Sequence, residues 1–116
     1  MGEPFVARIN FVELPAREFE ASEAFYSAVF GWSLADFGPS YSCTMTGNVD
    51  LGLQGDMAEA PAAPLPVVLV DDVEAVQAAV VHAGGKVSKP IFAFPGGRRF
   101  HFLDPNGLEL AIMQPD

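Results

Sequence analysis

The spacing of apolar residues divides the first half of the chain into one strand, one helix and three short strands. Alternation over Val6–Leu14 predicts a strand with Phe11 and Glu13 on one face. A helix is expected from about Glu18 to the glycine at position 31, because apolar residues recur there at helical spacing. This stripe consists of Ala21, Ala24, Phe25, Ala28 and Val29. The short strands are predicted over residues 33–37, 41–46 and 50–54, between Gly-containing turns.

The same pattern begins again after a proline-rich segment. Leu65–Val70 is an apolar strand, and Asp71 with Glu74 three residues later resembles a capping pair before a second helix. The stripe of that helix is formed by Val73, Val76, Val80 and Ala83. A strand over residues 86–94 follows, and then a hairpin over residues 98–114 whose turn is Asp104-Pro105-Asn106-Gly107.

This repeat predicts the fold class and the domain organisation. We expect an α+β domain built from two tandem βαβββ modules, which form a curved, cup-like mixed sheet. Module one covers about residues 5–56, residues 57–64 form a linker, and module two covers about residues 65–116. Because each module has one helix to cover one sheet face, the other faces are available to line a ligand cleft.

Composition and charge exclude several classes of partner. The chain has 116 residues, of which half are hydrophobic, and its formal net charge is −9. This charge repels nucleic acid and anionic membrane surfaces. We find no apolar run long enough to cross a membrane and no signal peptide, so a soluble cytoplasmic protein is expected. The single cysteine, Cys43, is expected to be buried and structural.

Three motifs resemble the vicinal oxygen chelate superfamily, which contains glyoxalase I, bleomycin-resistance proteins and extradiol dioxygenases. They are FVELP followed by AFYSAVFGW, then LVDDVEAVQAAVVHAGG, and finally FLDPNGLEL. Together with the module repeat they cover nearly the whole chain. The resemblance implies paired βαβββ modules, usually assembled as a homodimer around a cup-shaped site.

The resemblance also implies four metal-ligand positions, on the first, fourth, fifth and eighth strands. In this sequence they fall on Phe11 (or Asn10, if the register slips by one), near Leu53 or Gln54, on Leu65 and on Ala111. Only Gln54 carries a plausible donor, whereas a divalent metal needs three or four donors from His, Cys or carboxylate groups. We therefore predict no metal and no other cofactor, with a divalent metal kept as an alternative.

Two carboxylates are the candidate catalytic residues. Alternation places Glu13 on the face of Phe11, and Glu109 on the face of Ala111. If both strands line the cup, the two carboxylates could act as general acid and base, or could grip a cationic or hydroxylated ligand. The alternative interpretation is an ion pair with Arg8, Arg98 or Arg99, or a solvated strand edge.

The candidate ligand-binding residues are Phe11, Gln54, Arg99, His101 and Met113. His101 could contact a ligand or move a proton, or it could be a hydrogen-bonded surface histidine. Arg98 and Arg99 could present a guanidinium to an anionic group, or they could simply balance the acidic charge. The aromatic residues around the first helix are expected to be core residues. These are Phe25, Tyr26, Phe30 and Trp32.

Three functions are consistent with the sequence. The first, which we favour, is a metal-free dimer of the bleomycin-resistance type that binds a small organic ligand. The second is an enzyme, namely a lyase, isomerase or dioxygenase that uses a divalent metal or Glu13 and Glu109. The third is a structural or regulatory domain that has kept the fold without the chemistry.

Overall fold

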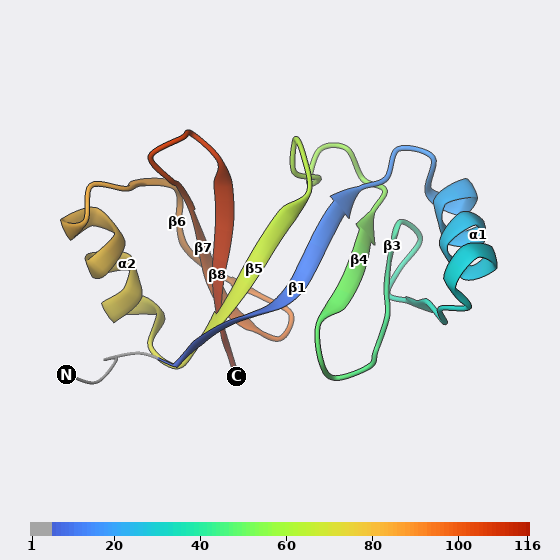
Figure 1. Ribbon diagram of the computed structural model, residues 1–116, viewed down its shortest axis with the longest axis horizontal. Helices are drawn as coiled ribbons and strands as arrows, with labels where there is room; N and C mark the ends of the chain where they lie inside the picture. Colours follow the sequence, from blue (N-terminus) through green and yellow to red (C-terminus); the bar gives the residue numbers. More distant parts are fainter. Residues whose placement is uncertain (1–5) are drawn as a thin grey trace. The chain divides into compact units, whose positions relative to one another are not determined.

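Two compact units make up the chain in the computed structural model, which describes residues 6–116. One unit is Asn10–Leu65, and the other comprises Pro66–Asp116 with the described residues up to Ile9. The element order along the chain is strand, helix and three strands, and then the same again (Figure 1). The predicted α+β fold and the repeated βαβββ order are therefore confirmed.

The Asn10–Leu65 unit contains a small mixed sheet and one helix. Its elements are most of β1 (Ala7–Pro15), then α1 (Phe19–Phe30), β2 (Ala35–Asp36), β3 (Tyr41–Cys43) and β4 (Asp50–Gln54). The strand order is β2-β3-β4-β1, in which β1 runs parallel to β4 and the other neighbours are antiparallel. The core is formed by Ala16, Phe19 and Leu53, with Leu14 and Tyr26 packed against it.

Strand β3 is shorter than the predicted strand over residues 41–46 because Asp50 draws the following residues into a turn. The Asp50 carboxylate accepts hydrogen bonds from the Thr44 hydroxyl at 2.7 Å, the Thr46 amide at 2.8 Å and the Gly47 amide at 3.1 Å. These bonds compete with the ladder for the backbone of residues 44–47. Burial by itself raises the pKa of Asp50, but the hydrogen bonds outweigh that effect and lower it.

The apolar stripe predicted to bury α1 is on the solvent side, which corrects our expectation for this helix. Phe19 is its one buried residue, while Phe25, Val29 and Phe30 are 58%, 54% and 56% exposed. Tyr26 is half-buried and joins the core, but Phe25 and Phe30 do not. The helical spacing was therefore predicted correctly, whereas the identity of the buried face was wrong.

The second unit has the same element order and a more fully packed helix. Its elements are β5 (Leu65–Val70), α2 (Val73–His82), β6 (Lys86–Phe94), β7 (Gly97–Leu103) and β8 (Glu109–Pro115). The strand order is β5-β8-β7-β6, with β5 and β8 parallel and the other neighbours antiparallel. A core beneath α2 consists of Val70, Val73, Val76, Phe100 and Ile112.

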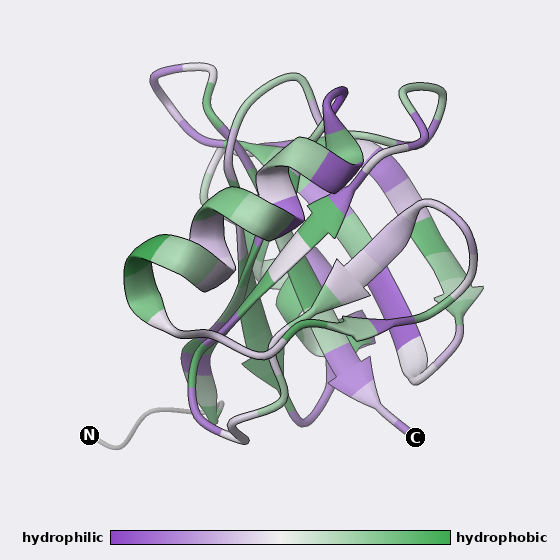
Figure 2. Ribbon diagram, turned by 90° about the vertical axis from the view of Figure 1, so that its right-hand side faces the viewer, coloured by the Kyte–Doolittle hydropathy of each residue, from purple (hydrophilic) through white to green (hydrophobic). Residues whose placement is uncertain are grey.

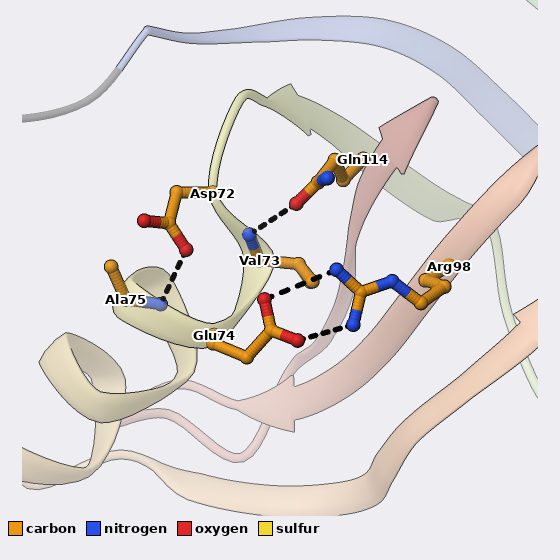
Figure 3. A network of polar contacts seen from close by, with 6 residues as sticks. All are labelled: Asp72, Val73, Glu74, Ala75, Arg98 and Gln114. Atoms are coloured by element: carbon orange, nitrogen blue, oxygen red, sulfur yellow. Dashed lines mark hydrogen bonds and ion pairs between the residues drawn. The ribbon is translucent and has the colours of Figure 1, made fainter. Parts of the chain in front are cut away.

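Polar contacts fix the beginning of α2 (Figure 3). The residue that caps the helix is Asp72, not the predicted Asp71, and its carboxylate accepts a hydrogen bond from the Ala75 amide at 3.0 Å. The Val73 amide donates to the Gln114 side-chain oxygen of β8 at 2.8 Å. Glu74 binds the guanidinium of Arg98 on β7 through both carboxylate oxygens. The Val73 and Ala75 amides belong to the first turn, where backbone N–H groups have no partner within the helix. Glu74 places a negative charge near the positive end of the helix dipole, where an acidic side chain is favourable.

The closing hairpin has the predicted turn. Asp104 accepts hydrogen bonds from the amides of Asn106 at 2.8 Å and Leu108 at 3.0 Å, and Gly107 has a φ of 80°. These backbone donors, that of Leu108 foremost, lower the pKa of Asp104. In the described part of the chain, neither helix has the length and hydrophobicity that a bilayer crossing requires.

Candidate functional site

The strand face opposite α2 carries the polar residues that the sequence singled out in the second module. Phe100 and Ile112 are paired neighbours on β7 and β8, and both pack beneath α2. Side chains alternate along a strand, so the residues on either side of these two lie on the other face. Arg99 is paired with Met113, His101 with Ala111, and Leu103 with Glu109. Arg99, His101 and Leu103 therefore share this face of β7.

His101 and Glu109 form the centre of this face. The Nδ1 atom of His101 lies 3.1 Å from a carboxylate oxygen of Glu109, and the Ser88 hydroxyl donates to the same oxygen at 3.1 Å. His101 is only 3% exposed, whereas the Glu109 side chain is 30% exposed. Because a carboxylate can only accept, Nδ1 must carry the proton that is shared with Glu109. The ring of His101 is thereby fixed in one orientation.

The surroundings of His101 favour the neutral imidazole by lowering its pKa. Burial lowers the pKa of His101 and outweighs the opposing effect of the hydrogen bond that His101 donates to Glu109, and the positive charges of Arg99 and Lys89 lower the pKa further. In the neutral ring with Nδ1 protonated, Nε2 has a lone pair and is an acceptor. This Nε2 atom is buried and makes no hydrogen bond within residues 6–116. The His101 ring therefore holds an oriented acceptor nitrogen just beneath this face.

Arg99 lies against two aromatic rings beside His101. Its guanidinium carbon is 5.5 Å from the centroid of Phe92 and 5.3 Å from that of Phe94, distances at which a cation is attracted by a ring face. The Phe92 ring is also 5.9 Å from the ring of His101. The β6 and β7 strands thus place a flat aromatic and cationic surface next to the histidine.

The corresponding face of the Asn10–Leu65 unit is lined by Phe11 and Tyr41. A side chain at Gly52 would bring its Cβ within 2.5 Å of both the Phe11 ring and the Tyr41 hydroxyl, so only glycine allows this close packing. Glu13 is paired with Gly52 and is buried at 4% exposure. Gln54 is partly committed to its own loop, because its side-chain oxygen accepts a hydrogen bond from the Asp56 amide at 3.0 Å.

Among the predicted site residues, the structure groups Arg99, His101, Glu109 and Met113 on adjoining strands of one unit. Phe11, Glu13 and Gln54 belong to the other unit. The predicted pairing of Glu13 with Glu109 stays a prediction. Arg98 does not present its guanidinium to an anionic ligand on this face, because its side chain points to the α2 side and binds Glu74.

The sequence did not indicate the role of Ser88 or of the two phenylalanines around Arg99. Simple alternation fails in β6 because its register with β7 shifts between Val87 and Lys89 and again between Lys89 and Phe92. The proline at position 90 was the available signal, since proline inside a strand often marks such an irregularity.

The residues at the positions implied for metal ligands do not fit a metal ion. Phe11, Leu65 and Ala111 carry no donor atom, and Leu65 and Ala111 are almost fully buried. The part of the chain that the structure describes also contains no cluster of three His, Cys, Asp or Glu side chains with metal-binding geometry. Phe11, Leu65 and Ala111 therefore cannot hold a divalent ion at these positions.

Comparisons with known proteins agree with this architecture. Residues 8–112 match the family model of the Glyoxalase/Bleomycin resistance protein/Dioxygenase superfamily. The chain is 32% identical to proteins named "Putative glyoxylase CFP32" from Mycobacterium bovis and Mycobacterium tuberculosis, over 90% of this chain and 44% of theirs. It thus spans less than half the length of the curated relatives it matches.

Two solved structures show the same fold at low sequence identity. The Mn(II)-bound glyoxalase from Novosphingobium aromaticivorans has a TM-score of 0.69 and 23% identity, over 94% of this chain and 40% of that one. The methylmalonyl-CoA epimerase from Mycobacterium tuberculosis has a TM-score of 0.72 and 12% identity, over 93% and 87% of the two chains. Because the family model covers nearly all of the sequence, the chain belongs to the Glyoxalase/Bleomycin resistance protein/Dioxygenase superfamily.

Proposed function

We propose that this protein binds a small organic molecule, without a resident metal, on the β7–β8 face that carries His101. The observation behind the proposal is the Nε2 atom of His101, which is buried and makes no hydrogen bond with the described residues. Buried polar atoms nearly always have a partner, so an oriented acceptor of this kind favours a ligand that donates a hydrogen bond to it.

The neighbouring side chains suggest the chemistry of that ligand. Phe92, Phe94 and Met113 offer apolar surface, and Arg99 adds a cationic group held against the two rings. A flat aromatic molecule with a hydroxyl group would place its ring along this surface and donate its hydroxyl proton to Nε2 of His101. Glu109 then acts as a positioning residue that sets the tautomer of the histidine.

The donor chemistry of the chain supports a metal-free mode of binding. The implied ligand positions on β1, β5 and β8 hold Phe11, Leu65 and Ala111, none of which can coordinate a divalent ion. Binding therefore relies on hydrogen bonds and aromatic contacts. Elemental analysis of the purified protein should find less than one divalent ion per chain.

The contacts among His101, Glu109 and Ser88 favour a second candidate, a lyase or isomerase that transfers a proton. The neutral imidazole could take a proton from a bound substrate at Nε2, and the Glu109 carboxylate at 3.1 Å would stabilise the resulting imidazolium. Ser88 holds the carboxylate in place. Curated relatives named as glyoxylases make an enzyme a reasonable second candidate. A role for Glu13 as the paired acid remains part of this candidate.

A thermal-shift assay with catechol, salicylate and benzamidine tests the proposal with hydroxylated, anionic and cationic flat molecules. Ligand at ten times its Kd stabilises the folded state by about 1.4 kcal/mol, which corresponds to roughly 5 °C for a domain of this size. We expect this stabilisation from catechol or salicylate. An NMR spectrum of the same mixture then distinguishes binding alone from chemical conversion of the probe.

Two variants locate the binding site. His101→Asn keeps a donor toward Glu109 but removes Nε2, so it should abolish the ligand-induced shift. Glu74→Gln alters a carboxylate on the α2 side of the sheet and should keep the full shift, which makes it the matched control. Equal shifts in the wild type and His101→Asn, or no shift with any of the three probes at millimolar concentration, would contradict the proposal.

A further inference from the structure

Two positively charged side chains flank His101 on the sheet face opposite α2. Lys89 on β6 is paired with His101 across the ladder, and Arg99 precedes His101 by two residues on β7. Residues paired across a ladder, like residues two apart on one strand, point to the same face of a sheet. Both charges are near enough to lower the pKa of His101. The imidazole whose Nε2 atom is the proposed acceptor therefore has two positive neighbours.

The negative charge of this face lies on the other side of His101. The Glu109 carboxylate is 3.1 Å from Nδ1 of His101 and accepts a hydrogen bond from the Ser88 hydroxyl at 3.1 Å. Because the two ring nitrogens point in different directions, Glu109 does not face Nε2. Glu109 is paired with Leu103, two residues after His101, whereas Arg99 lies two residues before it. His101 therefore separates the acidic group from the guanidinium.

Arg99 is oriented before any ligand binds. Its guanidinium carbon lies 5.5 Å from the ring centroid of Phe92 and 5.3 Å from that of Phe94. A guanidinium keeps its N–H donors in its own plane, in a fork that matches the two oxygens of a carboxylate. Contact with the rings restricts the side chain, which reduces the entropy lost when a ligand binds. Lys89 is exposed and adds a second, more flexible charge.

The overall charge of −9 does not prevent an anion from binding at this face. At physiological ionic strength, exposed charges more than about 8 Å apart are largely screened from each other. The charged groups that act on the pKa of His101 are Arg99, Lys89 and Glu109. Positive groups thus outnumber the negative one at this place, although the chain as a whole is acidic.

We propose that the molecule bound at this face is a hydroxylated aromatic carboxylate, whose carboxylate lies between Arg99 and Lys89 while its hydroxyl donates to Nε2 of His101. Its ring packs along Phe92, whose own ring is 5.9 Å from that of His101. The carboxylate site rests on the proposed binding of a small molecule at His101. Arg99 and Lys89 add selectivity for an anion over a neutral molecule of the same shape.

Two matched probes test the selectivity. 3-Hydroxybenzoate and 3-hydroxybenzamide share the ring and the hydroxyl group, but a neutral amide replaces the carboxylate in the second. The meta position prevents the hydroxyl from bonding to the neighbouring substituent. By isothermal titration calorimetry, 3-hydroxybenzoate should bind about tenfold more tightly, because hydrogen bonds to a charged acceptor are the stronger ones. High salt should reduce this advantage.

The outcomes separate the carboxylate site from the ligand site. Equal affinity for the two probes, or no binding of 3-hydroxybenzoate, would overturn the carboxylate site. If catechol still binds in that case, and His101→Asn abolishes its binding, the ligand site at His101 stands without it. If none of these molecules binds, both proposals are contradicted.

Charge-removing variants locate the carboxylate site. Arg99→Gln and Lys89→Gln should each weaken binding of 3-hydroxybenzoate about tenfold and change that of 3-hydroxybenzamide less than about twofold. Arg98→Gln, next to Arg99 but on the α2 side, and Lys86→Gln on β6 are the matched controls and should keep the preference. His101→Asn should weaken both probes alike, because both donate the same hydroxyl. A preference that survives in Arg99→Gln, or that is lost equally in Arg98→Gln, would overturn the proposal.

Discussion

The two helices of this protein occupy equivalent positions in the repeated module but are attached very differently. Helix α2 buries Val73 and Val76, and its first turn is tied to Asp72, Arg98 and Gln114. Helix α1 buries Phe19 alone, and its N-terminal residue Glu18 makes no side-chain cap. An amphipathic sequence thus determines that a helix forms, while the residues around it determine which face is covered.

This difference has a consequence for how each unit is used. In the second unit, the apolar face of α2 packs against the core of that unit. The opposite face of its sheet carries the buried His101 and the carboxylate of Glu109. The first unit leaves apolar helix surface exposed to solvent (Figure 2). The proposed ligand face and the exposed helix surface therefore belong to different units and can be altered separately.

The largest expected effect compares one aromatic residue from each unit. Phe100→Ala should lower the free energy of unfolding by about 3–5 kcal/mol, because the ring is fully buried beneath α2. Phe25→Ala on α1 should lower it by less than about 0.5 kcal/mol. Urea titrations at protein concentrations low enough to keep the chain monomeric provide both values. A similar loss in the two variants would show that Phe25 is part of the core.

A smaller difference in folding stability is expected between the N-termini of the two helices. Asp72→Ala removes the acceptor of the Ala75 amide and should cost about 1 kcal/mol of stability, as is usual for a capping aspartate. Glu18→Ala should have no measurable effect, since Glu18 makes no such bond. Chemical denaturation with circular dichroism detects the difference. An equal loss in Glu18→Ala would imply a cap that α1 lacks in this structure.

The smallest expected effect is the pH dependence due to His101. Its folded pKa is lowered from the ordinary value of 6.5, so the unfolded chain binds the proton first as the pH falls. Its contribution to stability is complete above about pH 6.5 and decreases as the pH drops toward the folded pKa. One proton allows a slope of at most about 1.4 kcal/mol per pH unit.

Two histidine variants isolate that contribution. His101→Asn should remove this part of the slope between pH 7 and pH 5, and His82→Asn, at the exposed end of α2, is the matched control. The measurement is the denaturation midpoint across this pH range. A slope that survives in His101→Asn but disappears in His82→Asn would refute the assignment.

Much of the fold could be predicted from the sequence because local signals and long-range packing agree in the second unit. The turn at Asp104, the strand alternation around His101 and the valine stripe of α2 all follow from residue spacing, and all are confirmed. For α1, spacing alone was insufficient, because Phe19 and Tyr26, which lie outside the predicted stripe, meet the core, while the stripe itself is exposed.

The candidate site was predictable only in part. Alternation placed Arg99, His101, Glu109 and Met113 on neighbouring strands without indicating which side chains would meet. The contact between His101 and Glu109 depends on the pairing of β7 with β8, which follows from the hairpin turn. Ser88 reaches the same carboxylate from an irregular strand, and no simple periodicity predicts that contact.

The most direct test of the ligand site is an NMR measurement on protein labelled with ¹⁵N at its two histidines, in the presence of catechol. We expect His101 to be neutral with the proton on Nδ1, and its Nε2 resonance to move on addition of catechol while His82 stays unchanged. A proton on Nε2 in the free protein, or an Nε2 resonance that does not respond to catechol, salicylate or benzamidine, would contradict the proposed role of His101.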